Sequence, residues 1–265
     1  MTDPAGEAKA GERSGGREPA LSELPGWRAL CLTVLAVDVL LLILHMVAVA
    51  FANDIPNFVY GLFNLGMESN LPTWWASVLW LGVSAAAFFC LSAELASPCR
   101  GRLAPLWALV GLVFLVASID EVATIHEEVG SFLARERTWS PVLQLFPGGS
   151  PGSPWIVFCL PLVALALLVI AAFLWRRFAR RPALRLCTLI AAVCYGLAVA
   201  CDYYQGLDTI SKDAVAALAG MSGPALSRAT VPVEESLENL GSSLLLLALF
   251  AHGQLVRAST RAGKR

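Results

Sequence analysis

The sequence predicts an all-α membrane protein, a six-helix transmembrane bundle with short interfacial segments in the outer loops. Three observations predict this class. Hydrophobic residues make up 57% of the 265 residues and charged residues only 15%. The mean hydropathy is +0.67, and the apolar runs last about 17 to 25 residues, the length that crosses a bilayer. A soluble domain of this size carries more charge and clearer amphipathic periodicity.

Three regions follow one another along the chain. Residues 1–25 are rich in Gly, Pro and mixed charge without an apolar run, so we expect a disordered cytoplasmic tail. Residues 26–257 form the six-span domain, and residues 258–265 form a basic cytoplasmic tail. The expected spans are 27–52, 73–95, 103–126, 154–176, 183–202 and 231–256.

The distribution of basic residues predicts the orientation. Arginines gather before the first span, between spans two and three, between spans four and five, and after span six, whereas the alternate loops hold few. By the positive-inside rule, both termini are cytoplasmic and loops one, three and five face outward from the plasma membrane. Loop one has enough Phe, Tyr and Leu to lie along the interface as a short helix. The preference for Arg over Lys is compatible with a GC-rich bacterial genome.

Ionisable residues from five segments converge at one depth. Asp120, Asp202, Glu238 and His45 each lie 17 to 19 residues from the inner basic residue of their span. At 1.5 Å per residue this is about 26–28 Å, near the outer edge of a hydrocarbon core of roughly 30 Å. Glu68 lies only a few residues before span two and belongs to the same level. We therefore expect a common site in the outer leaflet.

The stretch "SIDEVATIHEEVG" is the densest part of this layer. It places Asp120, Glu121, Glu127 and Glu128 around His126 at the end of an outgoing span. Carboxylates at a helix C-terminus oppose the helix dipole. In a regular helix His126 points about 100° away from Glu127. The imidazole can join the common site only if the helix end unwinds or a neighbouring helix supplies its partner.

The last span has two interpretations. Glu234 and Glu235 follow Pro232, and acids in the first turn of a helix that begins at a proline complement its dipole. Alternatively, these two acids share a face with Glu238 and belong to the common site. The small residues that follow on this face would allow another helix to approach closely.

Crowded carboxylates with one or two imidazoles favour a divalent metal, with Zn, Mn or Fe the best candidates. No HExxH motif or CxxC pair occurs, so the metal prediction rests on convergence alone. Glu121 or Glu127 is the candidate general base. The candidate metal ligands are His45, Glu68, Asp120, His126, Asp202, Glu234 and Glu238.

Three functions remain open. We favour a membrane-embedded, metal-dependent enzyme that acts on a lipid headgroup or a small molecule from the outer side. The alternatives are a proton- or divalent-cation-coupled transporter and a structural or interaction protein without a ligand. A transporter needs a polar route to the cytoplasm, and near the midplane Asp38 is the one ionisable residue that the sequence offers. We expect the lipid bilayer as partner and no nucleic acid, and the oligomeric state stays open.

Overall fold

The computed structural model describes residues 20–97, 103–135 and 154–262, and within these ranges every regular element is helical. Six of the described helices are long and apolar enough to cross a membrane, which confirms the all-α fold of a multi-pass membrane protein. They are α1 (Trp27–Ala50), α3 (Leu71–Leu95), α4 (Leu106–Ala123), α8 (Leu160–Arg177), α9 (Pro182–Gln205) and α11 (Gly223–Ala262).

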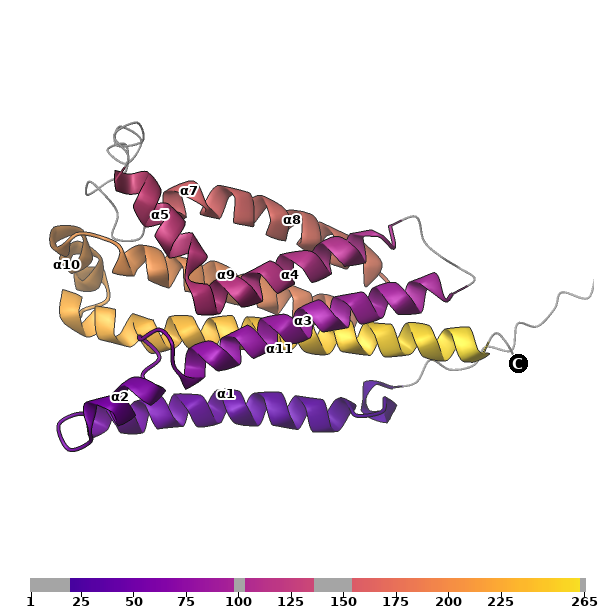
Figure 1. The fold of residues 1–265 in the computed structure, drawn as a ribbon, viewed down its shortest axis with the longest axis horizontal. Helices are drawn as coiled ribbons and strands as arrows, with labels where there is room; N and C mark the ends of the chain where they lie inside the picture. The colour runs from indigo at the N-terminus through magenta and orange to yellow at the C-terminus, as the bar shows by residue number, and fades with distance from the viewer. Residues whose placement is uncertain (1–19, 98–102, 136–153, 263–265) are drawn as a thin grey trace, which may run out of the picture.

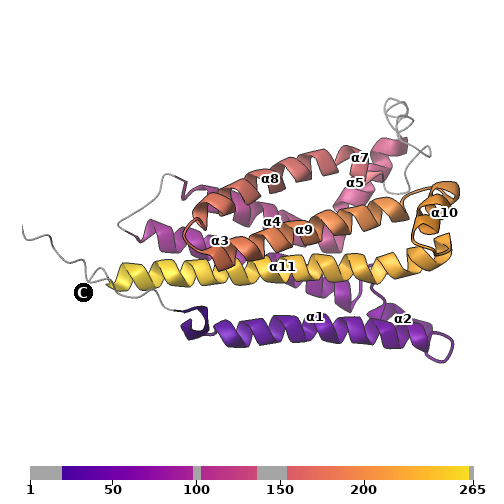
Figure 2. The same cartoon turned by 180° about the vertical axis from the view of Figure 1, so that it is seen from behind.

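The longest helix, α11, is the centre of the bundle (Figures 1 and 2). It packs against α9, α3 and α1, while α3 also packs against α4. Helix α8 packs against α9, α4 and the short helix α7 (Trp155–Phe158). Helix α1 begins and α11 ends at the same end of the bundle, which we call the terminal end (Figure 1).

Short helices gather at the opposite end, where α4 ends and α11 begins (Figure 1). We call it the acidic end, because Glu68, Asp120 and Glu238 lie there. Its short helices are α2 (Asn57–Phe63), α5 (Ile125–Arg135), α7 (Trp155–Phe158) and α10 (Thr209–Leu218).

Small residues allow close helix packing in a core with large aromatic side chains. Trp107, Phe114 and Phe178 are almost fully buried there. A Cβ atom built on Gly111 of α4 would lie 2.7 Å from the ring of Phe88, so the ring packs directly on the helix backbone. Many large apolar side chains, by contrast, point outward along the spans. This surface is what a bilayer would cover, and its extent agrees with a membrane protein.

Several helix boundaries differ from the predicted ones. The last helix begins at Gly223 rather than at residue 231, and Pro232 lies inside it. The fourth span begins at Leu160, because the chain turns at Cys159 between α7 and α8. Residues Leu21–Glu23 of the expected N-terminal tail form a short 3₁₀ helix, η1. Residues 1–19 and 263–265 of the predicted tails, and Arg100 and Arg102, lie outside the described residues.

Candidate carboxylate and histidine site

Helix α4 breaks at Thr124, and this break builds the centre of the site. Thr124 has a φ of 48°, in the left-handed region that a β-branched residue rarely adopts. The chain then restarts as α5, and His126 folds back onto the last turn of α4. Its backbone N–H donates to Asp120 Oδ1 at 2.8 Å, and its Nδ1 lies 2.6 Å from Asp120 Oδ2. The helix end therefore unwinds, which was one of the two conditions for His126 to join the site.

Trp155 extends this pair towards α9. Its ring meets the His126 ring edge-on, with the centroids 4.9 Å apart, and its Nε1 donates to Asp202 Oδ2 at 2.9 Å. Gly130 of α5 makes this contact possible, since a Cβ there would lie 2.5 Å from the backbone N of Trp155. Three separate segments are thus joined through Asp120, His126, Trp155 and Asp202.

Helix α11 contributes its acids from the middle of a helix. Because α11 begins at Gly223, Glu234 and Glu235 lie well beyond its first turn, and the helix-capping interpretation is wrong. Glu234 instead accepts a hydrogen bond from Gln205 Nε2. Both Glu234 and Glu238 lie close enough to Asp202 to interact with it electrostatically.

The acids of α5 are also placed differently from the prediction. Glu127 and Glu128 lie in the first turn of α5 rather than at the end of α4. Carboxylates in a first helical turn complement the dipole, so these two residues favour the new helix that starts after the break.

Glu68 reaches the site from an ordered loop. The side-chain amide nitrogen of Asn70 lies within hydrogen-bond distance of three backbone carbonyl oxygens, one in α2 and two in the loop, and Asn70 Oδ1 accepts from the N–H of Thr73. Burial and the charge of Glu127 raise the pKa of Glu68, while the charge of His126 acts in the opposite direction. Glu68 therefore lies in an environment that already has excess negative charge.

Together these segments form what we call the acidic cluster. Its carboxylates interact electrostatically with one another across α4, α9, α11 and the Glu68 loop. Among the described residues, the basic group that acts on several of them is His126. The members are Glu68, Asp120, Glu121, His126, Asp202, Glu234, Glu235 and Glu238.

His126 is the one group in this cluster that can offset negative charge. Burial lowers the pKa of its imidazole, but the hydrogen bond and charge of Asp120, with the charges of Glu127 and Asp202, outweigh burial and raise the pKa overall. Within the described part of the chain, Nε2 of this ring makes no hydrogen bond. The imidazole thus keeps one nitrogen available for a proton or a ligand.

The described residues include no group of three His, Cys, Asp or Glu side chains that are placed to hold one metal ion.

Two hydroxyl groups next to the cluster join α9 to α11. The hydroxyl of Tyr195 lies 2.9 Å from Ser242 Oγ. The Ser242 hydroxyl in turn lies 2.8 Å from the carbonyl oxygen of Glu238 and donates to it. Hydrogen bonds through Tyr195 and Ser242 therefore link α9 to the backbone of α11 at Glu238.

The structure does not bring His45 into the acidic cluster. Its Nδ1 accepts a hydrogen bond from the N–H of Leu65 at 3.1 Å, and the side chain is buried. It ties the end of α1 to the loop that holds Glu68. Asp38, about two turns earlier on α1, accepts from Trp75 Nε1 and from the Ser243 hydroxyl. Both residues join α1 to its neighbours.

A second ionisable network, absent from the sequence prediction, lies at the terminal end. Glu94 is only 1% exposed, and its Oε1 accepts from Trp107 Nε1 at 2.8 Å and Arg177 Nε at 2.5 Å. His252 Nε2 lies 3.2 Å from the same oxygen. Arg181 lies 2.6 Å from His252 Nδ1, and a guanidinium can only donate. The His252 proton is therefore on Nε2, directed at Glu94.

The depth argument that predicted the acidic cluster could also have found this network. Glu94, Arg177 and Arg181 lie within a few residues of a helix end at the terminal end, and His252 lies four residues before the predicted end of the last span. Because Glu94 and His252 stand alone in apolar sequence near basic loops, they resemble ordinary interfacial residues. Their burial is visible only in the structure.

The sequence has a match among the profiles of known protein families. The sequence profile of a family described as "Domain of unknown function (DUF8692)" matches residues 32–253. The chain belongs to this family. Neither the curated proteins nor the solved structures contain a match. The DUF8692 region spans all six long helices in whole or in part, and it contains both the acidic cluster and the terminal-end network.

Proposed function

We propose that the acidic cluster binds a divalent metal ion, and that the protein is a membrane-embedded, metal-dependent enzyme. Its substrate is a lipid headgroup or a small polar molecule that reaches the acidic end. The observation that supports this most directly is the pairing of Asp120 with His126. Histidines that bind metals usually give their other ring nitrogen to a carboxylate, which fixes the tautomer and the ring orientation. Here Asp120 holds Nδ1, and Nε2 remains available.

The residues of the cluster suit such an ion chemically. His126 Nε2 and the carboxylates of Glu68, Asp202 and Glu238 would hold it, and Asp120 would position His126. One imidazole among carboxylate oxygens fits Zn, Mn or Fe better than Ca. The Glu side chains can re-orient about their χ angles on fixed backbones, and a cation would offset the repulsion that separates them.

A divalent ion in this position would supply Lewis-acid activation of a water molecule or of a substrate oxygen. Glu121 interacts electrostatically with Glu68, Asp120 and Glu238, so it is the cluster's own candidate for accepting a proton. Glu127, which is exposed on α5, is the second candidate. In this proposal Trp155 contributes an apolar wall beside His126.

The orientation belongs to the same proposal. Five arginines lie within or beside the link between α8 and α9 at the terminal end, and Arg257 and Arg261 lie near the end of α11. The positive-inside rule then puts the terminal end in the cytoplasm and the acidic end outside. The five are Arg176, Arg177, Arg180, Arg181 and Arg185.

Metal analysis of the purified protein, combined with thermal melts in detergent, tests the proposal. We expect stoichiometric Zn, Mn or Fe, a lower melting temperature after chelation, and recovery when the metal is restored. Bound ligand stabilises the folded state by about 2.7 kcal/mol at a hundredfold excess over Kd. His126→Ala and Glu238→Gln should each abolish the response. Glu128→Gln is the matched control, because Glu128 is exposed and lies outside the cluster.

The network at the terminal end favours a second candidate function. A proton-coupled transporter needs ionisable groups at both ends, and Glu94 with His252 supplies the second one. A wild-type protein without stoichiometric metal, whose melting temperature is the same with and without chelator, would overturn the enzyme proposal and favour this alternative. In that case the acidic cluster would hold protons instead of a metal.

A further inference from the structure

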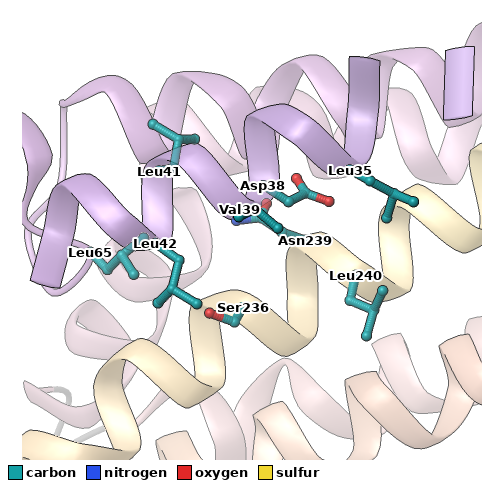
Figure 3. A pocket seen from close by; sticks show the side chains of 9 residues that line it. All are labelled: Leu35, Asp38, Val39, Leu41, Leu42, Leu65, Ser236, Asn239 and Leu240. Carbon is teal, nitrogen blue, oxygen red and sulfur yellow. The ribbon is translucent and has the colours of Figure 1, made fainter. Parts of the chain in front are cut away.

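A second candidate binding site lies between α1 and α11, away from the acidic cluster. A cavity of about 170 Å³ has walls of five residues from α1, three from α11 and Leu65 (Figure 3). Most of these side chains are aliphatic. The polar ones are Asp38, Ser236 and Asn239.

Asn239 carries a buried side-chain acceptor, Oδ1, whose hydrogen-bonding capacity is unused among the described residues. It is only 4% exposed, and its Oδ1 has no hydrogen-bond partner among the described residues. Buried side-chain acceptors are almost always paired, because leaving one unpaired in an apolar surrounding is unfavourable. Asn239 lines the cavity, and its amide can turn about χ2, a broad torsion, so that the buried Oδ1 meets a donor placed inside the cavity.

Asp38 makes the same wall richer in acceptors. Trp75 Nε1 donates to its Oδ1 at 2.7 Å, and the Ser243 hydroxyl donates to its Oδ2 at 2.8 Å. These two bonds fix the carboxylate, which still has unused lone pairs. The polar part of the cavity therefore calls for a hydrogen-bond donor and is unsuited to an anion.

The position of the cavity limits how an occupant can enter. Asp38 lies 11 residues after the start of α1 and 12 before its end, so it is about 17 Å from either end. This is the middle of the span, a depth that phosphate and sugar headgroups do not reach. Leu35, Val39 and Leu240 line the cavity and are also exposed on the outer surface of the bundle. The mouth thus opens towards the bilayer.

The volume limits the size of the part that is held. A cavity of about 150 Å³ accommodates one benzene molecule, so this one has room for a single ring or a short chain segment. The rest of a larger molecule would extend between α1 and α11 into the lipid.

We propose that this cavity binds the hydroxyl-bearing end of a neutral, bilayer-soluble amphiphile, with the hydroxyl donating to Asn239 Oδ1 beside Asp38. Two sources share this chemistry, a long-chain or isoprenoid alcohol and the ring of a quinol. The site is independent of the metal proposal, because it uses other residues of α11 and is reached from the membrane.

Photo-crosslinking in lipid nanodiscs tests the site with three diazirine probes. They are a long-chain alcohol, its methyl ether, which lacks the donor, and a quinol with the same chain. We expect the alcohol, the quinol or both to label α1 and α11 peptides about five- to tenfold more than the ether, the difference that one hydrogen bond makes. The relative labelling by alcohol and quinol identifies the source.

Variants locate the contact. Asn239→Leu keeps a similar volume but removes the acceptor, so the alcohol and the ether should label it equally. Leu32→Phe, at a position that is 71% exposed on α1 and outside the cavity, is the control and should keep the wild-type difference. Equal labelling of the wild type by alcohol and ether would overturn the proposal and identify an acyl-chain groove only. This comparison needs no variant, so it remains decisive if Asn239→Leu fails to fold.

Discussion

Removing the Glu94 carboxylate should strongly destabilise the protein, and the structure gives the magnitude. In Glu94→Ala, the Trp107 and His252 donors lose their acceptor while both side chains stay buried. A buried donor left unpaired costs about 1–3 kcal/mol. Arg177 is 30% exposed and can turn towards water, so it adds less. The expected loss is about 4 kcal/mol, within the range of about 3–5 kcal/mol for breaking a buried ion pair.

Glu94→Gln separates the charge from the hydrogen bonds. The amide oxygen can still accept from Trp107 and His252, whereas the charge opposite Arg177 is lost. We expect about half the loss seen for Glu94→Ala. Because Glu94 Oε2 is buried and has no hydrogen-bond partner among the described residues, the new amide N–H₂ would also be unpaired there. That penalty keeps the substitution from being neutral.

The assay is reversible unfolding in bicelles, with Glu128→Ala as the control for loss of an exposed carboxylate. The free energy of unfolding should fall in the order control, Gln variant, Ala variant. A loss below about 1 kcal/mol for Glu94→Ala, the size of a surface ion pair, would refute the reasoning. It would mean that water reaches Glu94 and that the network is not a buried one.

Two further predictions concern the acidic end. The folded-state pKa of His126 is raised above the unfolded value of about 6.5, so the pair with Asp120 stabilises the metal-free protein fully below that pH. This stability, about 1 kcal/mol for a partly exposed pair, is lost as pH rises through the raised pKa; Asp120→Asn should flatten the pH profile of the melts. Gly130→Ala should displace Trp155, because a backbone nitrogen 2.5 Å from the new Cβ cannot yield locally. The fluorescence of the Trp155 indole should shift, and the metal affinity of the protein should fall. An unchanged fluorescence spectrum would show that α5 and α7 are not in contact at Gly130.

The six spans could be predicted because each contains a predominantly apolar run long enough to cross a bilayer. The start of α11 could not, since Pro232 is a typical first residue of a helix and the stretch before it has no apolar periodicity. The helix continues through this proline and packs against α9 and α10, contacts that the local sequence does not reveal.

The level of the site could be predicted more reliably than its membership. Counting residues along a span gives depth, so Asp120, Asp202 and Glu238 were correctly expected to share one end of the bundle. Depth says nothing about which neighbour a helix face meets. His45 has the expected depth, yet its face on α1 meets Leu65 rather than the cluster.

The two ionisable clusters differ in how many hydrogen-bond donors and positive charges neighbour their carboxylates. This difference supports a functional role for the acidic end. At the terminal end, the Glu94 carboxylate accepts from three donors on its own bundle. At the acidic end, carboxylates from four segments face one imidazole, beside a Thr124 held in a strained conformation. Repulsion and strain both oppose folding, and neither adds stability to the chain alone. A bound cation or a bound proton would relieve the repulsion. The arrangement therefore supports the proposal that the acidic end binds a cation or a proton.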